Sequence, residues 1–273
     1  MKDIEEFINN INLNTVVDNT EPMLEDEEGF REQMIRGFEK LLLLENKHKG
    51  ESVLVMGHGP SLLNIDKKDY QSHVKITCND FHKVSDFFDD FVPDFWCTAN
   101  SYEVIKKPFE ICLDKNINIF VTVPRKCEFM DLLQIAKEKE KMDLVHAWQW
   151  EHRIFQHMLA RKYNYNKIYT HCNTITNHMI AFALWLGCDT IDVTGFDMSY
   201  KKSLETTGMT HAGFNHESIA NDHSKAGINA FDDPRERRQI ISDLKYLCAV
   251  ARSKSIRINN LSYKTNGLPK IIS

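Results

Sequence analysis

The stretch that decides the fold is ESVLVMGHGPSL, residues 51–62. Its apolar residues 53–56 run directly into a glycine-rich turn, as a buried parallel strand does when the next turn opens a helix. Glycine lets a backbone approach a ligand closely, proline suits the first helical position, and the N–H groups of such a turn can hold an anion. The pattern predicts a phosphate site, with an ordinary strand-to-helix turn as the alternative. The residues of this predicted site are Gly57, His58, Gly59, Pro60 and Ser61.

The turn differs from two common phosphate-binding fingerprints. A Walker loop requires Gly-Lys-Ser/Thr after the turn, and the dinucleotide fingerprint GxGxxG requires a third glycine. Residues 57–62 contain neither feature. A phosphate site at this turn would therefore be of another type.

Beyond residue 50 short apolar segments alternate with helical ones. This alternation predicts an α/β fold with a Rossmann-like, mostly parallel sheet and helices on both faces. Strands are expected at 52–57, 74–78, 95–99, 117–123, 142–146, 167–170, 189–195 and 255–258. Helices are expected near 60–70, 101–114, 128–140, 149–162, 174–187 and 234–253.

The first fifty residues have a different character. They are polar, and apolar side chains at helical spacing predict an amphipathic helix over about 24–47. Such a helix either docks a partner or packs on the main domain. We therefore expect an N-terminal helical extension, 1–50, followed by one nucleotide-binding catalytic domain, 51–273.

Composition narrows the class of protein. The 273 residues are 42% apolar, and 34 basic against 39 acidic residues leave a net charge of −5, which argues against a non-specific nucleic-acid binder. Seven scattered cysteines without a CxxC motif fit a reducing cytoplasm. No apolar run approaches the roughly 18 residues of a membrane span, and the acidic start MKDIEEFINN is unlike a secretory signal. We expect a soluble cytoplasmic protein; peripheral membrane association and homo-oligomerisation stay open.

Polar side chains follow several of the predicted strands. Asn79 comes after the second strand, Asn100 after the third, and Asp197 after the strand IDVTG. The carboxyl ends of parallel strands meet at one edge of a sheet, where ligands bind in open α/β folds. Thr174, at the start of the helix before IDVTG, could face the same ligand. Asparagine amides suit phosphate oxygens and ribose hydroxyls, although each of these residues could also be a turn former or a cap.

A long segment, 198–233, breaks the alternation of strands and helices. Segments of this length in compact domains are usually functional or disordered, and this one follows a strand end, so it could close over the site as a lid. It contains His211, His216 and His223. Their spacing matches no compact zinc motif, so we expect no metal here and favour one histidine as a general base; exposed loop histidines are the alternative.

Taken together, these elements resemble a known family. GHGPSL, CNDF, an asparagine at the third strand end, LGCDTIDVTGFDMSY and a histidine in HSK resemble glycosyltransferase family 42, the bacterial sialyltransferases that use CMP-sialic acid. VPDFWCTAN and GFDMSY…GMTHAGF also resemble domain of unknown function 115, which includes motility-accessory glycosyltransferases and 6-hydroxymethylpterin diphosphokinase-like proteins.

The resemblance implies roles for individual residues. Residues 57–61 and Asn79 would hold the nucleotide phosphates and ribose, Asn100 would contact the donor sugar or phosphate, and Asp197 would lie near the nucleotide. His223 matches the sialyltransferase base, and His211 matches the histidine of the second group. The implied activity is transfer of a sugar, most simply a nonulosonic acid, from a nucleotide-activated donor to a glycan or protein hydroxyl without a cofactor.

Two other functions stay open at this stage. A pterin diphosphokinase would move diphosphate from ATP and would need Mg²⁺, with Asp80 and Asp197 as the candidate ligands. A non-catalytic nucleotide-binding protein would use the N-terminal helix for docking. A glycosyltransferase of this kind should bind CMP, whereas a diphosphokinase should bind ATP with magnesium, so a binding measurement separates these two functions.

Overall fold

The fold is described from a computed structural model, which covers residues 27–84, 90–98, 102–121, 126–147, 154–164, 175–197 and 234–262. Across this part of the chain, seven parallel strands form one sheet in the order β5-β4-β3-β2-β1-β6-β7. The strands are β1 (Ser52–Met56), β2 (Val74–Cys78), β3 (Phe95–Thr98), β4 (Asn118–Val121), β5 (Val145–Ala147), β6 (Thr190–Thr194) and β7 (Arg257–Asn260). The predicted parallel α/β sheet is confirmed; the expected strand 167–170 lies outside the described residues.

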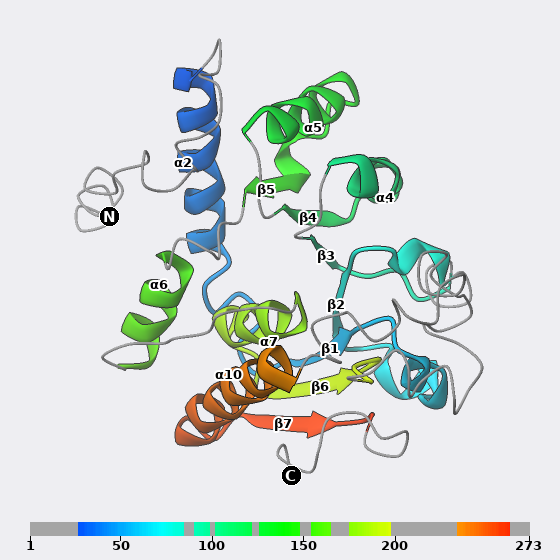
Figure 1. The fold of residues 1–273 in the computed structure, drawn as a ribbon, viewed down its shortest axis with the longest axis vertical. Coiled ribbons are helices and arrows are strands. Elements are labelled where there is room, and N and C mark those ends of the chain that lie inside the picture. The colour runs from blue at the N-terminus through cyan, green and yellow to red at the C-terminus, as the bar shows by residue number, and fades with distance from the viewer. Residues whose placement is uncertain are drawn as a thin grey trace.

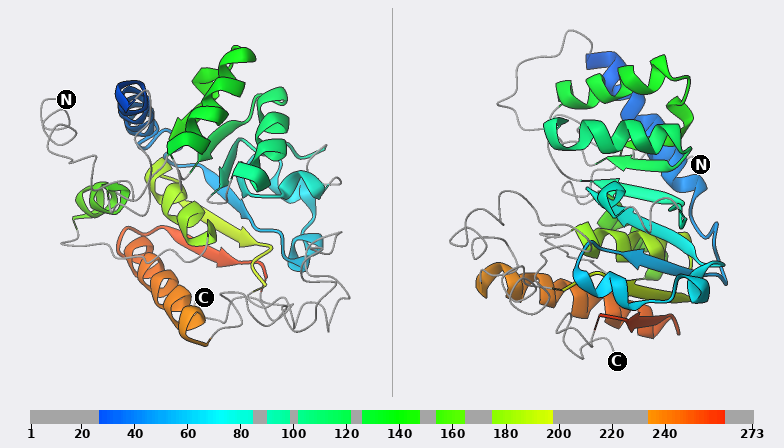
Figure 2. Two further views of the ribbon diagram at one scale, coloured as in Figure 1. Left: turned by 45° about the horizontal axis from the view of Figure 1, so that its top comes forward. Right: turned by 90° about the vertical axis from the view of Figure 1, so that its right-hand side faces the viewer.

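Helices cover both faces of this sheet (Figures 1 and 2). Helices α7 (Ile175–Leu186) and α10 (Pro234–Ser253) contribute to a core layer on one face. Helices α4 (Tyr102–Asp114) and α5 (Lys126–Glu138) contribute to the layer on the other. Because both faces are covered, the strands read as continuous apolar runs, and residues 53–56 of β1 are all fully buried. Helix α6 (Ile154–Tyr163) places Leu159, Ala160 and Tyr163 in the first of these layers.

The connection from β1 to β2 differs from the prediction. Where one helix was expected over 60–70, the structure has two 3₁₀ turns, η2 (Pro60–Asn64) and η3 (Lys67–Tyr70). Ile65 between them is extended, with φ −91° and ψ 143°, and the carboxylate of Asp66 accepts from the backbone N–H of Lys68 to begin the second turn. The first of these turns contains Ser61, whose side chain bonds with Asp197 and Ser262, as described below.

The N-terminal helix α2 (Glu27–Leu43) packs on the domain beside β5 (Figure 1). Leu41 is buried in the core, and its carbonyl accepts a 2.7 Å hydrogen bond from the indole N–H of Trp185. The ammonium of Lys40 donates to the carbonyls of Met142 and Asp143, at 3.0 and 3.1 Å, and to that of Val145 at 3.3 Å. The described part of the extension is therefore attached to the sheet edge.

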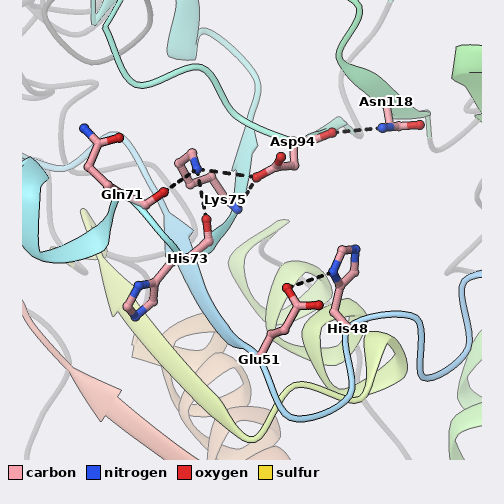
Figure 3. A network of polar contacts seen from close by, with 7 residues as sticks. All are labelled: His48, Glu51, Gln71, His73, Lys75, Asp94 and Asn118. Atoms are coloured by element: carbon pink, nitrogen blue, oxygen red, sulfur yellow. Dashed lines mark hydrogen bonds and ion pairs between the residues drawn. The ribbon is translucent and has the colours of Figure 1, made fainter.

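The amino-terminal edge of the sheet is held by its own polar side chains (Figure 3). The Asp94 carboxylate accepts from the backbone N–H of Lys75 at 2.8 Å, and the Asp94 carbonyl accepts from the side chain of Asn118 at 3.2 Å. The Lys75 ammonium donates to the carbonyl of His73 at 2.9 Å. These bonds connect the starts of β2, β3 and β4. None of the described helices is long and apolar enough to cross a membrane.

Candidate active site at the carboxyl edge

The order in which the chain adds strands to the sheet changes sides between β1 and β6. Strands β2 to β5 lie on one side of β1, whereas β6 and β7 lie on the other. In open α/β sheets such a switch point is where ligands bind, outside the carboxyl ends of the strands. The turn after β1 and the turn after β6 both lie at this point, because Met56 and Thr194 are neighbours in register.

The two turns are in direct backbone contact. The N–H of Gly57 donates to the carbonyl of Thr194 at 2.9 Å, and the N–H of Gly59 donates to the carbonyl of Gly195 at 2.7 Å. A β-carbon on Gly57 would collide with the carbonyl group of Gly195, whose φ of +69° also favours glycine. These glycines are therefore required by the approach of two chain segments to each other.

The second glycine of the turn makes room for a carboxylate. Gly59 has an ordinary φ of −60°, but a β-carbon on it would lie only 2.7 Å from the carboxyl carbon of Asp197. One oxygen of that carboxylate accepts from the Ser61 N–H at 3.0 Å and from the Ser61 hydroxyl at 2.9 Å. Asp197 thus closes onto the turn where the phosphate was expected.

This contact bears on how an anion could bind here. The N–H groups of Gly57, Gly59 and Ser61 all have acceptors, on the last residue of β6 or on the segment after it, and Pro60 has no N–H. An incoming anion could reach the Ser61 N–H only after displacing the Asp197 carboxylate. The role of residues 57–61 in nucleotide binding stays a prediction, and side chains at neighbouring strand ends become more important to it.

A serine that the sequence reasoning missed completes the contact between the turns. Ser262, just beyond β7, is fully buried, and its hydroxyl lies 2.8 Å from that of Ser61. The Ser61 hydroxyl oxygen accepts from the Gly195 N–H at 3.0 Å, and the Ser262 oxygen accepts from the Phe196 N–H at 3.3 Å. The sequence did contain a signal for Ser262, because this residue follows the strand predicted at 255–258 and the carboxyl ends of parallel strands share one edge of the sheet.

His58 points toward β2. Its Nε2–H donates to the carbonyl of Cys78 over 2.5 Å, and its ring centroid lies 6.2 Å from that of Phe81. Desolvation by the surrounding protein lowers the pKa of His58 to about 4, so the ring is neutral at physiological pH. It therefore connects two strand ends and offers no positive charge to a phosphate.

Asn79 lies at the end of β2, as predicted, in a left-handed conformation with φ +44°. Its backbone N–H donates to the Cys97 carbonyl at 3.1 Å, and its own carbonyl accepts from the Trp96 indole N–H at 2.8 Å. Its side-chain oxygen accepts from the Thr98 hydroxyl at 3.2 Å. The residue is thus fixed through both its backbone and its side chain.

The structure brings together residues 57–61, Asn79 and Asp197 at one edge of the sheet. Four other predicted site residues, Asn100, Thr174, His211 and His223, lie outside the described residues, as does the predicted lid 198–233. Helix α7, which begins at Ile175 and precedes β6, runs back from this edge.

No protein-family model matches this chain, and neither does any curated protein. Among solved structures it is similar to the sialyltransferase CstII from Campylobacter jejuni in complex with cytidine-5'-monophosphate, at 18% identity over 82% of this chain and 88% of the other, with a TM-score of 0.49. An apo α-2,3-sialyltransferase from Campylobacter jejuni is similar at 18% identity over 80% and 79% of the two chains, with a TM-score of 0.44. Likeness at this level does not establish a shared activity.

Proposed function

We propose that this protein is a glycosyltransferase that moves a nonulosonic acid from its CMP-activated form to a hydroxyl group of a glycan or a protein. The observation that carries the proposal is the meeting of three sequence elements at one place. The turn 57–61 and the Gly-x-Asp element ending at Asp197 lie at the switch point between β1 and β6, and Asn79 lies beside them at the end of β2, although the three are far apart in the chain. These are the described elements on which the resemblance to family 42 rests.

In this reaction the bond from the anomeric carbon of the donor sugar to the phosphate oxygen breaks, and a bond to the acceptor oxygen forms. The acceptor proton passes to a histidine, His223 or else His211, and CMP leaves with the electron pair of the broken bond. Hydrogen-bond donors aimed at the phosphate stabilise the charge that develops on it. Among the described residues, the Asn79 amide is the donor that we assign to this task.

The first test measures binding. Wild-type protein should bind CMP in titration calorimetry, and Asn79→Asp should bind it at least tenfold more weakly, because the substitution replaces a donor by a negative charge of nearly the same shape. Asn116→Asp is the matched control, since Asn116 also has a positive φ, of 58°, but lies in the turn before β4 at the opposite edge of the sheet. That control should bind CMP as the wild type does.

A second measurement tests the chemistry. Purified protein incubated with a CMP-activated nonulosonic acid and a set of glycan acceptors should release CMP in step with acceptor consumption. Binding of ATP only with magnesium, and none of CMP, would replace this proposal by diphosphate transfer. A third outcome would indicate a nucleotide-binding protein without catalysis. In that case the purified protein binds CMP but transfers sugar to no acceptor, and cells that carry Asn79→Asp keep their normal phenotype.

A further inference from the structure

We infer that Ser61 forms a small oxyanion site in the turn after β1, and that the Asp197 carboxylate occupies this site as an internal competitor of a phosphate ligand. The two donors of the site are the backbone N–H and the hydroxyl of Ser61. The identification of the competing ligand with the phosphate of CMP rests on the proposed function. The site itself does not, because an oxyanion of the protein already fills it.

Two donors of one residue meet at a single carboxylate oxygen. Oδ2 of Asp197 lies 3.0 Å from the backbone nitrogen of Ser61 and 2.9 Å from its hydroxyl oxygen. Gly59 makes the space for that oxygen, because a β-carbon at this position would collide with it. A backbone N–H and a hydroxyl that converge on one point bind a carboxylate oxygen and a phosphate oxygen in the same way.

The neighbours of the Ser61 hydroxyl direct its hydrogen toward this oxygen. A serine hydroxyl has one hydrogen and two lone pairs, whereas an ionised carboxylate only accepts, so Asp197 takes the hydrogen. The Gly195 N–H, which can only donate, takes one lone pair of Ser61 Oγ at 3.0 Å. The Ser262 hydroxyl, 2.8 Å away, therefore donates to the second lone pair. Any acceptor-only oxygen that replaced the carboxylate would meet the same two donors.

The acceptor of the Ser61 N–H differs in kind from the acceptors of its neighbours. The N–H groups of Gly57, Gly59 and Leu62 donate to backbone carbonyls, which are fixed by the chain around them. The Ser61 N–H donates to the side chain of Asp197, a partly exposed residue just beyond the end of β6. A side chain can rotate about its own bonds while the backbone contacts between the two turns stay intact. The Ser61 donors can therefore be passed from Asp197 to a ligand.

The test compares two substitutions that both remove the charge of Asp197. Asp197→Ala opens the site, whereas Asp197→Asn keeps an oxygen that can still accept from Ser61. In titration calorimetry, Asp197→Ala should lower the Kd of inorganic phosphate about tenfold relative to the wild type, because hydrogen bonds to a charged acceptor no longer keep the site closed. The decrease for Asp197→Asn should be much smaller. Addition of Ser61→Ala to Asp197→Ala should remove most of the gain, because it removes one of the two donors.

A spectroscopic measurement locates the bound phosphate. The backbone amide signal of Ser61 should shift when inorganic phosphate is added to Asp197→Ala, and should stay unchanged in the wild type at the same concentration. An unchanged signal in Asp197→Ala overturns the inference.

Equal gains of phosphate affinity in Asp197→Ala and Asp197→Asn also overturn the inference, because the lost charge alone would then explain them. If the variants bind inorganic phosphate as expected but neither they nor the wild type bind CMP, the proposed function fails and the oxyanion site stands. If Asp197→Ala does not fold, Asp197→Ser, whose side chain is one atom shorter than that of aspartate, takes its place.

Discussion

The carboxylate of Asp197 occupies the space that a side chain at position 59 would need. This explains why the glycine-rich turn after β1 contains Gly59 although the backbone there is ordinary, with φ −60°. The carboxylate also accepts from the Ser61 N–H, so the Asp197 side chain takes the N–H group that the turn would otherwise offer to a bound anion. The turn after β1 thus makes a contact within the protein, and in the proposed function it also forms one wall of the nucleotide site.

Gly59→Ala should destabilise the protein by about 1–3 kcal/mol, the range for an added group in a fully packed place. The new β-carbon would lie 2.7 Å from the Asp197 carboxyl carbon and 2.8 Å from the Gly195 carbonyl oxygen. Urea unfolding gives the free energy directly. In an Asp197→Ala background the same substitution should be less harmful, because half of the collision is gone; strictly additive effects of the two changes would contradict the packing described here.

Ser262→Ala should lower the free energy of unfolding by about 1–3 kcal/mol, because it leaves the buried N–H of Phe196 without its acceptor and removes a partner of Ser61. Ser253→Ala is the control, since Ser253 is exposed near the end of α10 and its hydroxyl donates only to the Val250 carbonyl. Chemical denaturation of both variants checks this. Equal effects of the two substitutions would show that Ser262 does not hold the segment after β6.

Lys40→Met should loosen helix α2. The ammonium donates to three carbonyls around η5 (Met142–Leu144) and β5, and burial lowers its pKa, so the substitution removes bonds from a charged donor worth about 1–2 kcal/mol. Arg36→Met, one turn earlier, removes only an exposed ion pair with Glu32 and should change stability by less than about 0.5 kcal/mol. Hydrogen exchange should become faster along α2 in the first variant only; equally fast exchange in both would argue against Lys40 as the anchor.

The sheet could be predicted from the sequence because its strands are buried on both faces and therefore read as short apolar runs between polar segments. The helix expected over 60–70 could not be distinguished from two 3₁₀ turns. Ser61 has hydrogen-bond partners that lie 133 to 201 positions further along the chain. A local pattern contains no information about contacts at that distance.

The candidate site shows the same division. Strand ends placed Asn79 and Asp197 correctly, because the carboxyl ends of parallel strands always share an edge. The purpose of the glycines could not be read in the same way. A glycine that admits a phosphate and a glycine that admits another part of the chain are identical in sequence, and only the position of the Asp197 carboxylate distinguishes them.

A buried histidine should make stability fall in mild acid. His146 on β5 is 6% exposed, stacks on Phe120 with ring centroids 4.5 Å apart, and neither of its nitrogens has a hydrogen-bond partner among the described residues. Burial, followed by the charges of Lys40 and Lys47, lowers the pKa of His146 to about 3. In the unfolded chain the pKa of a histidine is about 6.5, so below that pH the unfolded chain binds a proton that the folded chain does not bind. The contribution of His146 to the free energy of unfolding is therefore fully present above about pH 6.5 and declines as the pH falls toward about 3.

His146→Phe should therefore flatten the acid side of the stability profile. The ring and its stacking on Phe120 are kept, while the titrating group is removed, so the variant should gain on the order of 3 kcal/mol relative to wild type between pH 7 and pH 4. Urea unfolding at pH 8, 6 and 4 measures this, and the comparison at pH 8 isolates any packing effect of the new side chain. His58, whose pKa is lowered to about 4, still titrates in the variant, so a smaller acid slope must remain. If the free energy of unfolding depends on pH in the same way in the variant and the wild type, His146 binds a proton equally well in the folded and the unfolded protein, which would contradict this prediction.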